Sequence, residues 1–256
     1  MTTSFNERSI YYTTQGEGNP IILLHGFLES SSIWQSFIAE FGSKRQIICL
    51  DLPGHGKSET LGEEHSMELM AEVVEQVLTE LKVEKADLLG HSMGGYVALA
   101  FVEKNPKMAN RLILLNSTSV ADSDEKIQNR ERSIELVRKN KKAYISMAIS
   151  NLLTPDNNLR YQAQVDALKK EAMLFPTEGI VAALKGMKNR TDRTGVLKHF
   201  PGKKFMLTGE QDPLLDYQEI EDVAEGTRSK LYAFPGGHLS YLENKNQFLK
   251  IMHFIE

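Results

Sequence analysis

The chain has 256 residues, of which 30 are Lys or Arg and 34 are Asp or Glu, so its formal net charge at pH 7 is −4. Apolar residues make up 41% and charged residues 25% of the sequence, the balance of an ordinary globular protein. The acidic balance, with no stripe of Lys and Arg, argues against nucleic acid as a partner, and no run approaches the roughly 18 apolar residues of a membrane span.

The N-terminal part of the chain begins polar and then alternates between apolar runs and turns. Met1 to Arg8 lacks the apolar centre of a signal peptide. We predict an edge strand over Ser9 to Thr13 and a buried strand over Ile21 to Leu24, followed at once by His25-Gly26-Phe27. The apolar spacing over Ser30 to Phe41 then predicts a helix.

The next predicted strand, Gln46 to Leu50, holds the one cysteine of the chain, Cys49. A single cysteine allows no disulfide within the chain, so with the polar N-terminus we expect a cytoplasmic protein and a buried thiol. A turn rich in Gly and Pro, Asp51 to Ser58, ends this strand. Met67 to Leu81 is predicted as an amphipathic helix, because its apolar residues recur at i, i+3, i+4 and i+7.

A strand, a sharp turn and a helix follow in close succession. Ala86 to Leu89 is predicted as a buried strand, and a helical pattern begins soon after Ser92. Ser92 is flanked by Gly90 and Gly94, which gives the pattern G-x-S-x-G in a strand–turn–helix context. Side chains at the two glycine positions would collide in such a tight turn. The turn therefore exposes the Ser92 hydroxyl near the positive end of the helix.

The alternation of strands and helices predicts the architecture. Arg111 to Asn116 is one more predicted strand, and Leu112 to Leu115 within it is wholly apolar. Strands that are apolar on both faces belong to a parallel sheet covered on two sides. We therefore expect an α/β fold with a mostly parallel, doubly wound sheet.

Residues 119–193 carry only helical patterns, and we interpret them as an all-helical lid inserted into the sheet domain. The expected division is residues 1–118 and 194–256 for the sheet domain and 119–193 for the lid. Its predicted helices are Glu125 to Lys139, Lys142 to Leu153, Asn158 to Leu174 and Thr177 to Lys188. Some of its apolar side chains either line a pocket or form the core of the segment itself: Met147, Met173, Phe175 and Met187.

Strand signals return after this segment. Lys204 to Thr208 is a predicted strand followed shortly by Asp212, and Ser229 to Phe234 is a predicted strand followed by His238. Asn244 to Phe254 is predicted as a closing helix.

Three side chains that follow strand ends form a candidate catalytic set. A serine hydroxyl needs a base, and the base needs a carboxylate that fixes its tautomer. Ser92, Asp212 and His238 emerge at the same edge of a parallel sheet, where ligand sites form, and in the chain order Ser, Asp, His. Glu210 and Asp216 are the alternative carboxylates.

The negative charge of a tetrahedral intermediate needs two fixed donors. The backbone N–H of Met93, directly after the serine, is one, and the loop after Leu24 supplies the other through Phe27. No His, Cys, Asp or Glu spacing resembles a metal site, and nothing indicates a cofactor. His25 and His55 are expected to brace their turns.

The motifs together resemble those of the α/β-hydrolase superfamily, of the lidded serine esterase and lipase-like type. The resemblance covers nearly all of the chain outside 119–193. It rests on five motifs in order: His25-Gly26-Phe27, Asp51-Leu52-Pro53-Gly54-His55-Gly56-x-Ser58, Gly90-His91-Ser92-Met93-Gly94-Gly95, Gly209-x-x-Asp212 and Gly237-His238. It implies Ser92 as nucleophile, Asp212 as acid, His238 as base, and Phe27 and Met93 as oxyanion donors.

The expected function is hydrolysis of a small or medium carboxylic ester, a small-molecule acyl substrate, through an acyl-enzyme. The same residues suit a thioester, a lactone, a C–C bond beside a ketone, or acyl transfer to an alcohol. A non-catalytic ligand receptor on the same fold is a third hypothesis. The sequence leaves the substrate and the oligomeric state open.

Overall fold

The computed structural model describes residues 1–255. Its strands are β1 (Thr2–Phe5), β2 (Arg8–Gln15), β3 (Ile21–Leu24), β4 (Ile47–Leu50), β5 (Ala86–His91), β6 (Ala109–Leu115), β7 (Lys203–Gly209) and β8 (Lys230–Phe234). Its α-helices are α1 (Gln35–Phe41), α2 (Met67–Glu80), α3 (Met93–Lys104), α4 (Asp124–Ser150), α5 (Pro155–Arg160), α6 (Gln162–Ala172), α7 (Thr177–Lys188), α8 (Thr194–His199), α9 (Tyr217–Thr227), α10 (Ser240–Glu243) and α11 (Lys245–Ile255).

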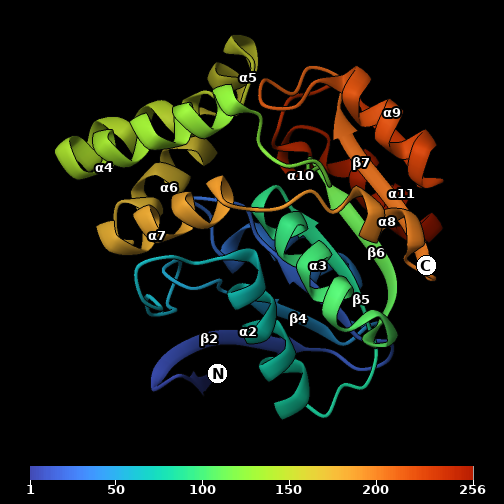
Figure 1. Cartoon of the computed structure of the whole chain (residues 1–256). Helices are drawn as coiled ribbons and strands as arrows, with labels where there is room; N and C mark the ends of the chain where they lie inside the picture. Colours follow the sequence, from blue (N-terminus) through green and yellow to red (C-terminus); the bar gives the residue numbers. More distant parts are fainter. Residues whose placement is uncertain (256) are drawn as a thin grey trace.

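The strands form one sheet in the order β1-β2-β4-β3-β5-β6-β7-β8. From β4 to β8 neighbouring strands are parallel, whereas β1 and β2 are antiparallel to their neighbours. The central strands β3, β4 and β5 are buried along their whole length, as expected for a sheet covered on both faces. The predicted α/β fold with a mostly parallel, doubly wound sheet is confirmed (Figure 1).

The edge of the sheet differs from the prediction. The segment predicted as an edge strand lies in β2, which is second in the sheet, and β1 forms the edge outside it. A two-residue turn joins the two strands, and its residues Asn6 and Glu7 both have positive φ, 48° and 64°. Such φ values favour the tight hairpin that pairs the strands. β1 is too short and too polar for its pattern to show in the sequence.

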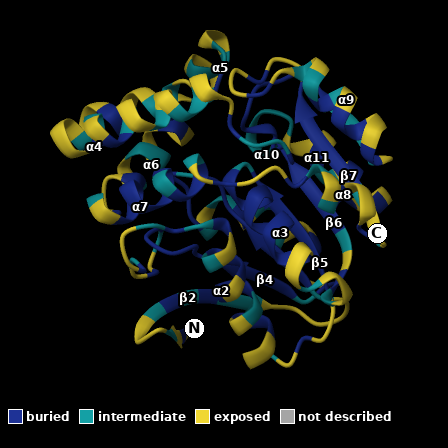
Figure 2. Ribbon diagram, viewed as in Figure 1, coloured by how far each residue is buried: buried dark blue, intermediate teal, exposed yellow. Residues whose placement is uncertain are grey.

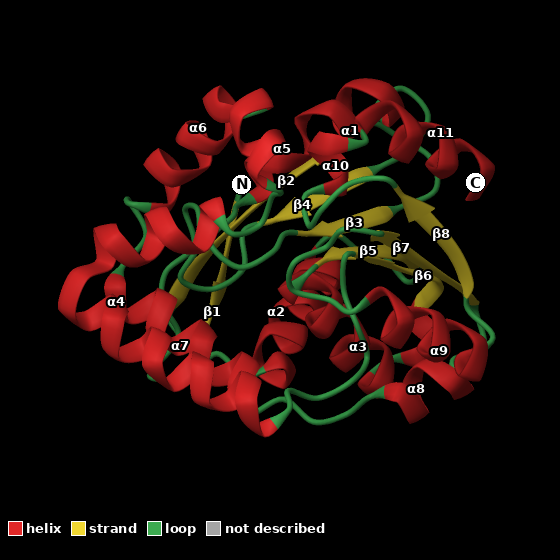
Figure 3. Ribbon diagram, turned by 90° about the horizontal axis from the view of Figure 1, so that it is seen from above, coloured by secondary structure: helices red, strands yellow, loops and turns green. Residues whose placement is uncertain are grey.

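Helices cover both faces of the sheet (Figure 3). On one face, α1 and α11 bury an apolar cluster that includes Trp34, Phe37 and Phe248. On the other, α2 and α3 bury a larger cluster that continues into α4, α6 and α7. Trp34 and Cys49 are each 1% exposed, which confirms both as core residues. Burial raises the pKa of the Cys49 thiol to about 12, so the thiol stays neutral.

Residues 119–193 contain α4 to α7, which gather on one side of the molecule (Figure 1). The amide of Arg193 donates to the carbonyl of Ser119 at 2.8 Å, so the two ends of the segment meet. The outer surface of α4 is largely exposed (Figure 2). The two helices predicted over 125–153 are joined in α4, but Asn140 breaks the helix with φ −156° and ψ 78°. The Asn140 side chain accepts from the Ala143 amide at 3.0 Å and so starts the second part.

Other helix bounds differ in detail. The helix predicted over 158–174 is two helices, α5 and α6, and the helix predicted over 30–41 begins with a 3₁₀ turn, Ser31–Trp34. The short helices α8 and α10 and the longer α9 are absent from the sequence prediction. Among residues 1–255, no helix combines the length and apolar character that crossing a bilayer requires.

Candidate active site

Ser92 lies on the sharp turn between β5 and α3. Its backbone has φ 49° and ψ −115°, a conformation that costs a non-glycine residue about 1–3 kcal/mol. A Cβ on Gly90 would lie 2.3 Å from the carbonyl oxygen of Gly94, and a Cβ on Gly94 would lie 2.3 Å from that of Leu24. Only glycine fits at either position, which confirms the predicted steric reason for both. The turn places the serine at the N-terminus of α3, where free amides favour negative charge.

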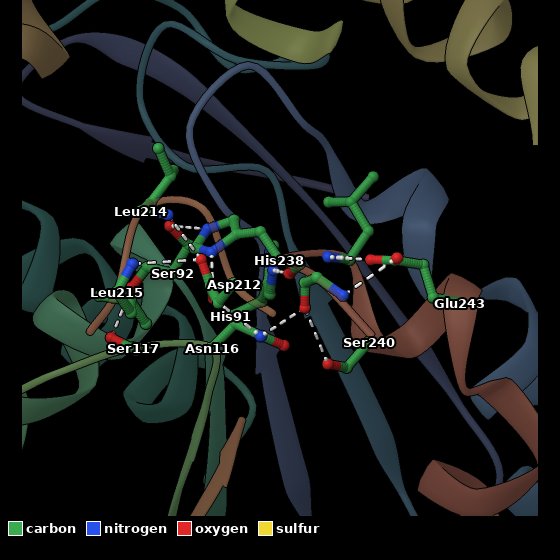
Figure 4. Close-up of polar contacts among 12 residues, drawn as sticks. His91, Ser92, Asn116, Ser117, Asp212, Leu214, Leu215, His238, Ser240 and Glu243 are labelled. Atoms are coloured by element: carbon green, nitrogen blue, oxygen red, sulfur yellow. Dashed lines mark hydrogen bonds and ion pairs between the residues drawn. The ribbon is translucent and has the colours of Figure 1, made fainter. Parts of the chain in front are cut away.

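The structure brings Ser92, His238 and Asp212 into one hydrogen-bonded chain (Figure 4). The Nε2 atom of His238 lies 2.9 Å from the Oγ atom of Ser92, and its Nδ1 atom lies 2.7 Å from Oδ2 of Asp212. Asp212 follows β7 and His238 follows β8, two neighbouring parallel strands. The distant residues therefore meet because their strands end at the same edge of the sheet.

The Asp212 carboxylate is held by four donors. Besides His238, the amides of Leu214 and Leu215 donate to Oδ1 at 2.9 and 3.2 Å, and the side chain of Asn116 donates to Oδ2 at 3.0 Å. Burial alone would raise the pKa of Asp212, but the charge and hydrogen bond of His238 and these further donors outweigh it, so the pKa is lowered. The group is thus an anion fixed in orientation beside the imidazole.

Glu243 fixes the loop that carries His238. The two carboxylate oxygens of Glu243 accept from the amides of Gly237 and Leu239, each at 3.0 Å, one on either side of the histidine (Figure 4). The amide of His238 itself donates to the carbonyl of Leu152 in the helical segment at 3.0 Å. The backbone at 237–239 is therefore held at three consecutive residues.

A second histidine, His91, supports the same loop with a positive charge. Its Nε2 atom faces the backbone oxygen of His238 at 2.9 Å, and its Nδ1 atom faces Oε2 of Glu29 at 2.8 Å. Both nitrogens face acceptors, so both must carry a proton. Burial alone would lower the pKa of His91, but the Glu29 charge outweighs burial and raises it. The pKa of Glu29 is lowered against its own burial by the same pair.

Glu29 also holds the loop that follows β3. Its Oε2 atom accepts from the amide of Gly26 at 2.7 Å, and its Oε1 atom accepts from the hydroxyl of Tyr241 at 2.9 Å. One carboxylate therefore connects the 26–29 turn, the residue before Ser92 and, through His91, the His238 loop.

Of the two residues predicted as oxyanion donors, Met93 directly follows the serine in the chain and Phe27 borders the same cavity as Ser92. Met93 is the first residue of α3, and Phe27 lies in the loop after β3. Neither amide donates to another group among residues 1–255. Both N–H groups therefore remain free to bind a ligand.

A cavity of about 660 Å3 opens at Ser92 and His238. Its apolar wall comes from the core and from the helical segment: Phe27, Tyr96, Leu136, Tyr144, Met147 and Met187. Of the four side chains left open by the sequence, Met147 and Met187 border the cavity. Phe175 is buried in the core, and Met173 is 37% exposed.

The other sequence candidates have structural partners. Asp216 caps α9 by accepting from the Gln218 amide at 2.8 Å, and Glu210 is exposed. His25 and His55 hydrogen-bond backbone groups of their loops, which confirms their bracing role. Among residues 1–255, no group of three or more His, Cys, Asp or Glu side chains is arranged to hold a metal ion.

Several residues of the site are missed by the sequence prediction. They are Glu29, Asn116, Glu243 and the ion-paired role of His91. Asn116 carries a usable signal, because it is a polar residue at the end of a wholly apolar strand. The partners of Glu29 and Glu243 depend on contacts between loops that no local pattern reveals.

A parallel sheet that brings a serine on a strand–turn–helix junction against a histidine and a carboxylate is the architecture of an α/β-type hydrolase. The chain belongs to the alpha/beta hydrolase fold family, whose profile matches residues 19–245.

Known proteins of similar fold include hydrolases. A thermophilic esterase from Thermogutta terrifontis, solved with malate bound, is 28% identical with a TM-score of 0.91, covering 98% of this chain and 94% of that one. The 2-hydroxymuconate semialdehyde hydrolase of a Pseudomonas species is 24% identical over 257 residues, 93% of this chain and 86% of its own length. An uncharacterized protein of Mycobacterium tuberculosis is 33% identical over 105 residues, 41% of this chain. That match spans only 31% of the length of the mycobacterial protein. The esterase and the semialdehyde hydrolase support a hydrolytic enzyme.

Proposed function

We propose that the protein is a serine hydrolase that cleaves a small or medium carboxylic ester through an acyl-enzyme. Ser92 is the nucleophile, His238 the general base and Asp212 the carboxylate that orients the base. The observation that carries the proposal is the unbroken hydrogen-bonded chain, 2.9 Å from Ser92 Oγ to His238 Nε2 and 2.7 Å from His238 Nδ1 to Asp212 Oδ2.

The geometry supports a definite path for the proton. Because Asp212 accepts from Nδ1, the neutral imidazole of His238 presents a lone pair at Nε2. Nε2 takes the Ser92 proton as Oγ attacks the ester carbonyl, and then gives that proton to the leaving alcohol. Water attacks the acyl-enzyme in the second half of the reaction, again with His238 as base, and the acid is released.

The oxyanion that forms in each half would be bound by the amides of Phe27 and Met93. Both are free of other acceptors among residues 1–255, and Met93 lies at the positive end of α3. One such donor typically contributes roughly 10²–10³ in turnover. The helical segment 119–193 serves as the lid domain, because its side chains close one wall of the cavity at Ser92.

An ester is the substrate class that the relatives favour. The Thermogutta terrifontis esterase is similar over nearly the whole chain at 28% identity. A panel of matched oxygen esters, thioesters, lactones and β-ketone substrates separates ester hydrolysis from the other reactions that this site suits.

The proposal is tested with a fluorescent fluorophosphonate, which reacts covalently with activated serines. We expect the wild-type protein to be labelled and to hydrolyse p-nitrophenyl butyrate, and the Ser92→Ala variant to lose both properties. Mass spectrometry of the labelled peptide identifies the site.

The matched control is Ser133→Ala, which removes another serine hydroxyl that borders the same cavity. This variant should keep the label. Ester turnover that persists in Ser92→Ala, at a rate above the buffer background, would overturn the assignment of the nucleophile.

A further inference from the structure

Three charged side chains that the proposed reaction does not use meet at the wall of the cavity. The Asp122 carboxylate, 1% exposed, pairs with Arg190 at 2.7 Å and with Arg130. Two guanidinium groups share one carboxylate, so the cluster carries one excess positive charge. A positive charge in a largely apolar cavity is costly unless a ligand or solvent partner compensates it.

Arg190 is held by several groups of the protein. Its guanidinium stacks on the ring of Tyr96 at 4.1 Å, and it donates to the carbonyls of Met187 and Val120, each at 3.0 Å, as well as to Asp122. Only 4% of its side chain is exposed. Arg190 therefore anchors the cluster and has little capacity for a ligand.

The protein binds the guanidinium group of Arg130 along one edge only. Its Nε and Nη2 atoms donate to the two oxygens of Asp122, and among residues 1–255 the one acceptor for its Nη1 atom is the sulfur of Met187, at 3.5 Å. Thioether sulfur is a weak acceptor, and a guanidinium has five N–H donors. The outer edge, formed by Nη1 and Nη2, thus keeps donors on a side chain that is 21% exposed and lines the cavity.

The cluster and the candidate nucleophile border the same cavity. Tyr96, on which Arg190 stacks, lies in α3, the helix that begins directly after Ser92. Ser92, Tyr96 and Arg130 all border the same cavity of about 660 Å3. One small molecule can therefore reach both Ser92 and the outer edge of Arg130.

We propose that Arg130 binds a carboxylate carried by the substrate, so that the preferred substrates are esters that bear a second, free carboxylate group. The planar edge of two N–H groups matches a carboxylate in a two-bond fork. The inference rests on the proposed ester hydrolysis and adds the chemical class of the substrate.

The test compares two esters of equal chain length, the p-nitrophenyl half-ester of adipate and p-nitrophenyl hexanoate. We expect the wild-type kcat/KM to favour the half-ester by about 10- to 100-fold, the range for hydrogen bonds to a charged group. In Arg130→Gln the ratio should fall toward one, and in Arg130→Lys, which keeps the charge without the fork, it should take an intermediate value.

The matched control is Arg132→Gln, which removes a more exposed arginine of the same helix that also borders the cavity. The ratio should stay near the wild-type value. If Arg132→Gln lowers the ratio as much as Arg130→Gln does, the preference reflects general charge and the proposed site is wrong.

Fluorophosphonate labelling of the same preparations separates the two proposals. A wild-type protein that is labelled but shows equal kcat/KM for the two esters overturns the carboxylate site alone. A protein that is neither labelled nor active on either ester overturns the proposed function and this inference with it. Because lysine keeps a positive charge beside Asp122, thermal unfolding should show Arg130→Lys folded even if Arg130→Gln is not.

Discussion

The charge on His91 is a consequence of its two acceptors. Glu29 and the backbone oxygen of His238 leave no position for a lone pair on the imidazole ring, so the ring is an imidazolium in a fully buried place. A buried ion pair of this kind adds little net stability over an apolar pair, but the loss of one partner is expensive because the other charge stays buried.

We therefore predict that Glu29→Gln lowers the free energy of unfolding by about 3–5 kcal/mol, the range for breaking a buried pair. The uncharged amide of the new side chain cannot neutralise the imidazolium. His91 must then either lose its proton or remain an unpaired buried charge, and both destabilise the folded protein. The pKa of His91 is raised, so its stabilising contribution is complete below its unfolded pKa of about 6.5 and declines as pH rises through the folded value. The destabilisation should therefore be larger at about pH 6 than at about pH 9, measured by urea unfolding.

The control for this prediction is Glu40→Gln. Glu40 pairs with His253 at 2.7 Å, but both side chains are exposed, 45% and 35%. An exposed pair contributes about 0–1 kcal/mol, so this variant should unfold almost like the wild type. An equal loss in the two variants would show that burial does not set the cost.

At the scale of residues, prediction from the sequence succeeds where chemistry follows a local pattern. Ser92 is found from the two glycines around it, and Asp212 and His238 from the strands they follow. Their convergence is a consequence of strand order, whereas their catalytic roles stay a prediction. Glu29 and Arg130 are missed, because each acquires its meaning from partners on other elements.

The turn between β5 and α3 leaves no room for larger residues. A Cβ on Gly90 would meet backbone atoms of residues 94 and 95 at 2.3–2.5 Å, and backbone cannot move aside cheaply. We predict that Gly90→Ala costs about 1–3 kcal/mol of stability, as overpacking typically does, and slows fluorophosphonate labelling. Thermal unfolding and the labelling rate are the measurements.

The matched glycine is Gly226, where an added Cβ meets nothing within 4 Å and which lies in α9. Gly226→Ala should stabilise the protein by about 0.5–1 kcal/mol, because alanine loses less backbone entropy in a helix. If both substitutions act alike, close packing does not explain Gly90.

Elements are predicted best where the chain has a long apolar period. The helix over 67–81 and the central strands agree with α2, β3, β4 and β5 to within two residues. β1 and α10 are each four residues long, which is too short for a period to show. The break at Asn140 falls between two predicted helices, because the local sequence there is polar throughout.

At the scale of the whole molecule, buried histidines make stability depend on pH. Burial lowers the pKa of His55 to about 3 and that of His65 to about 4, and it lowers the pKa of His25 as well. These rings stay neutral in the folded protein but bind protons in the unfolded chain below about pH 6.5. Stability must therefore fall as pH drops below about 6.5 and continue to fall until the folded pKa values are reached. The carboxylates with lowered pKa add to this loss only below about pH 4.3.

The window between about pH 6.5 and 4.5 thus isolates the histidines, and His55 alone should account for about 2 kcal/mol there. We predict that His55→Phe reduces the fall in unfolding free energy across this window by about that amount. The new ring can keep the contacts of His55 with Phe27 and Phe175, whose ring centroids lie 5.9 and 5.4 Å away. Phe175→Leu is the control, because it disturbs the same packing without removing a titrating group, so it should lower stability at both pH values by similar amounts. If the unfolding free energy of His55→Phe falls across this window by as much as that of the wild type, the buried imidazole of His55 does not cause the acid sensitivity.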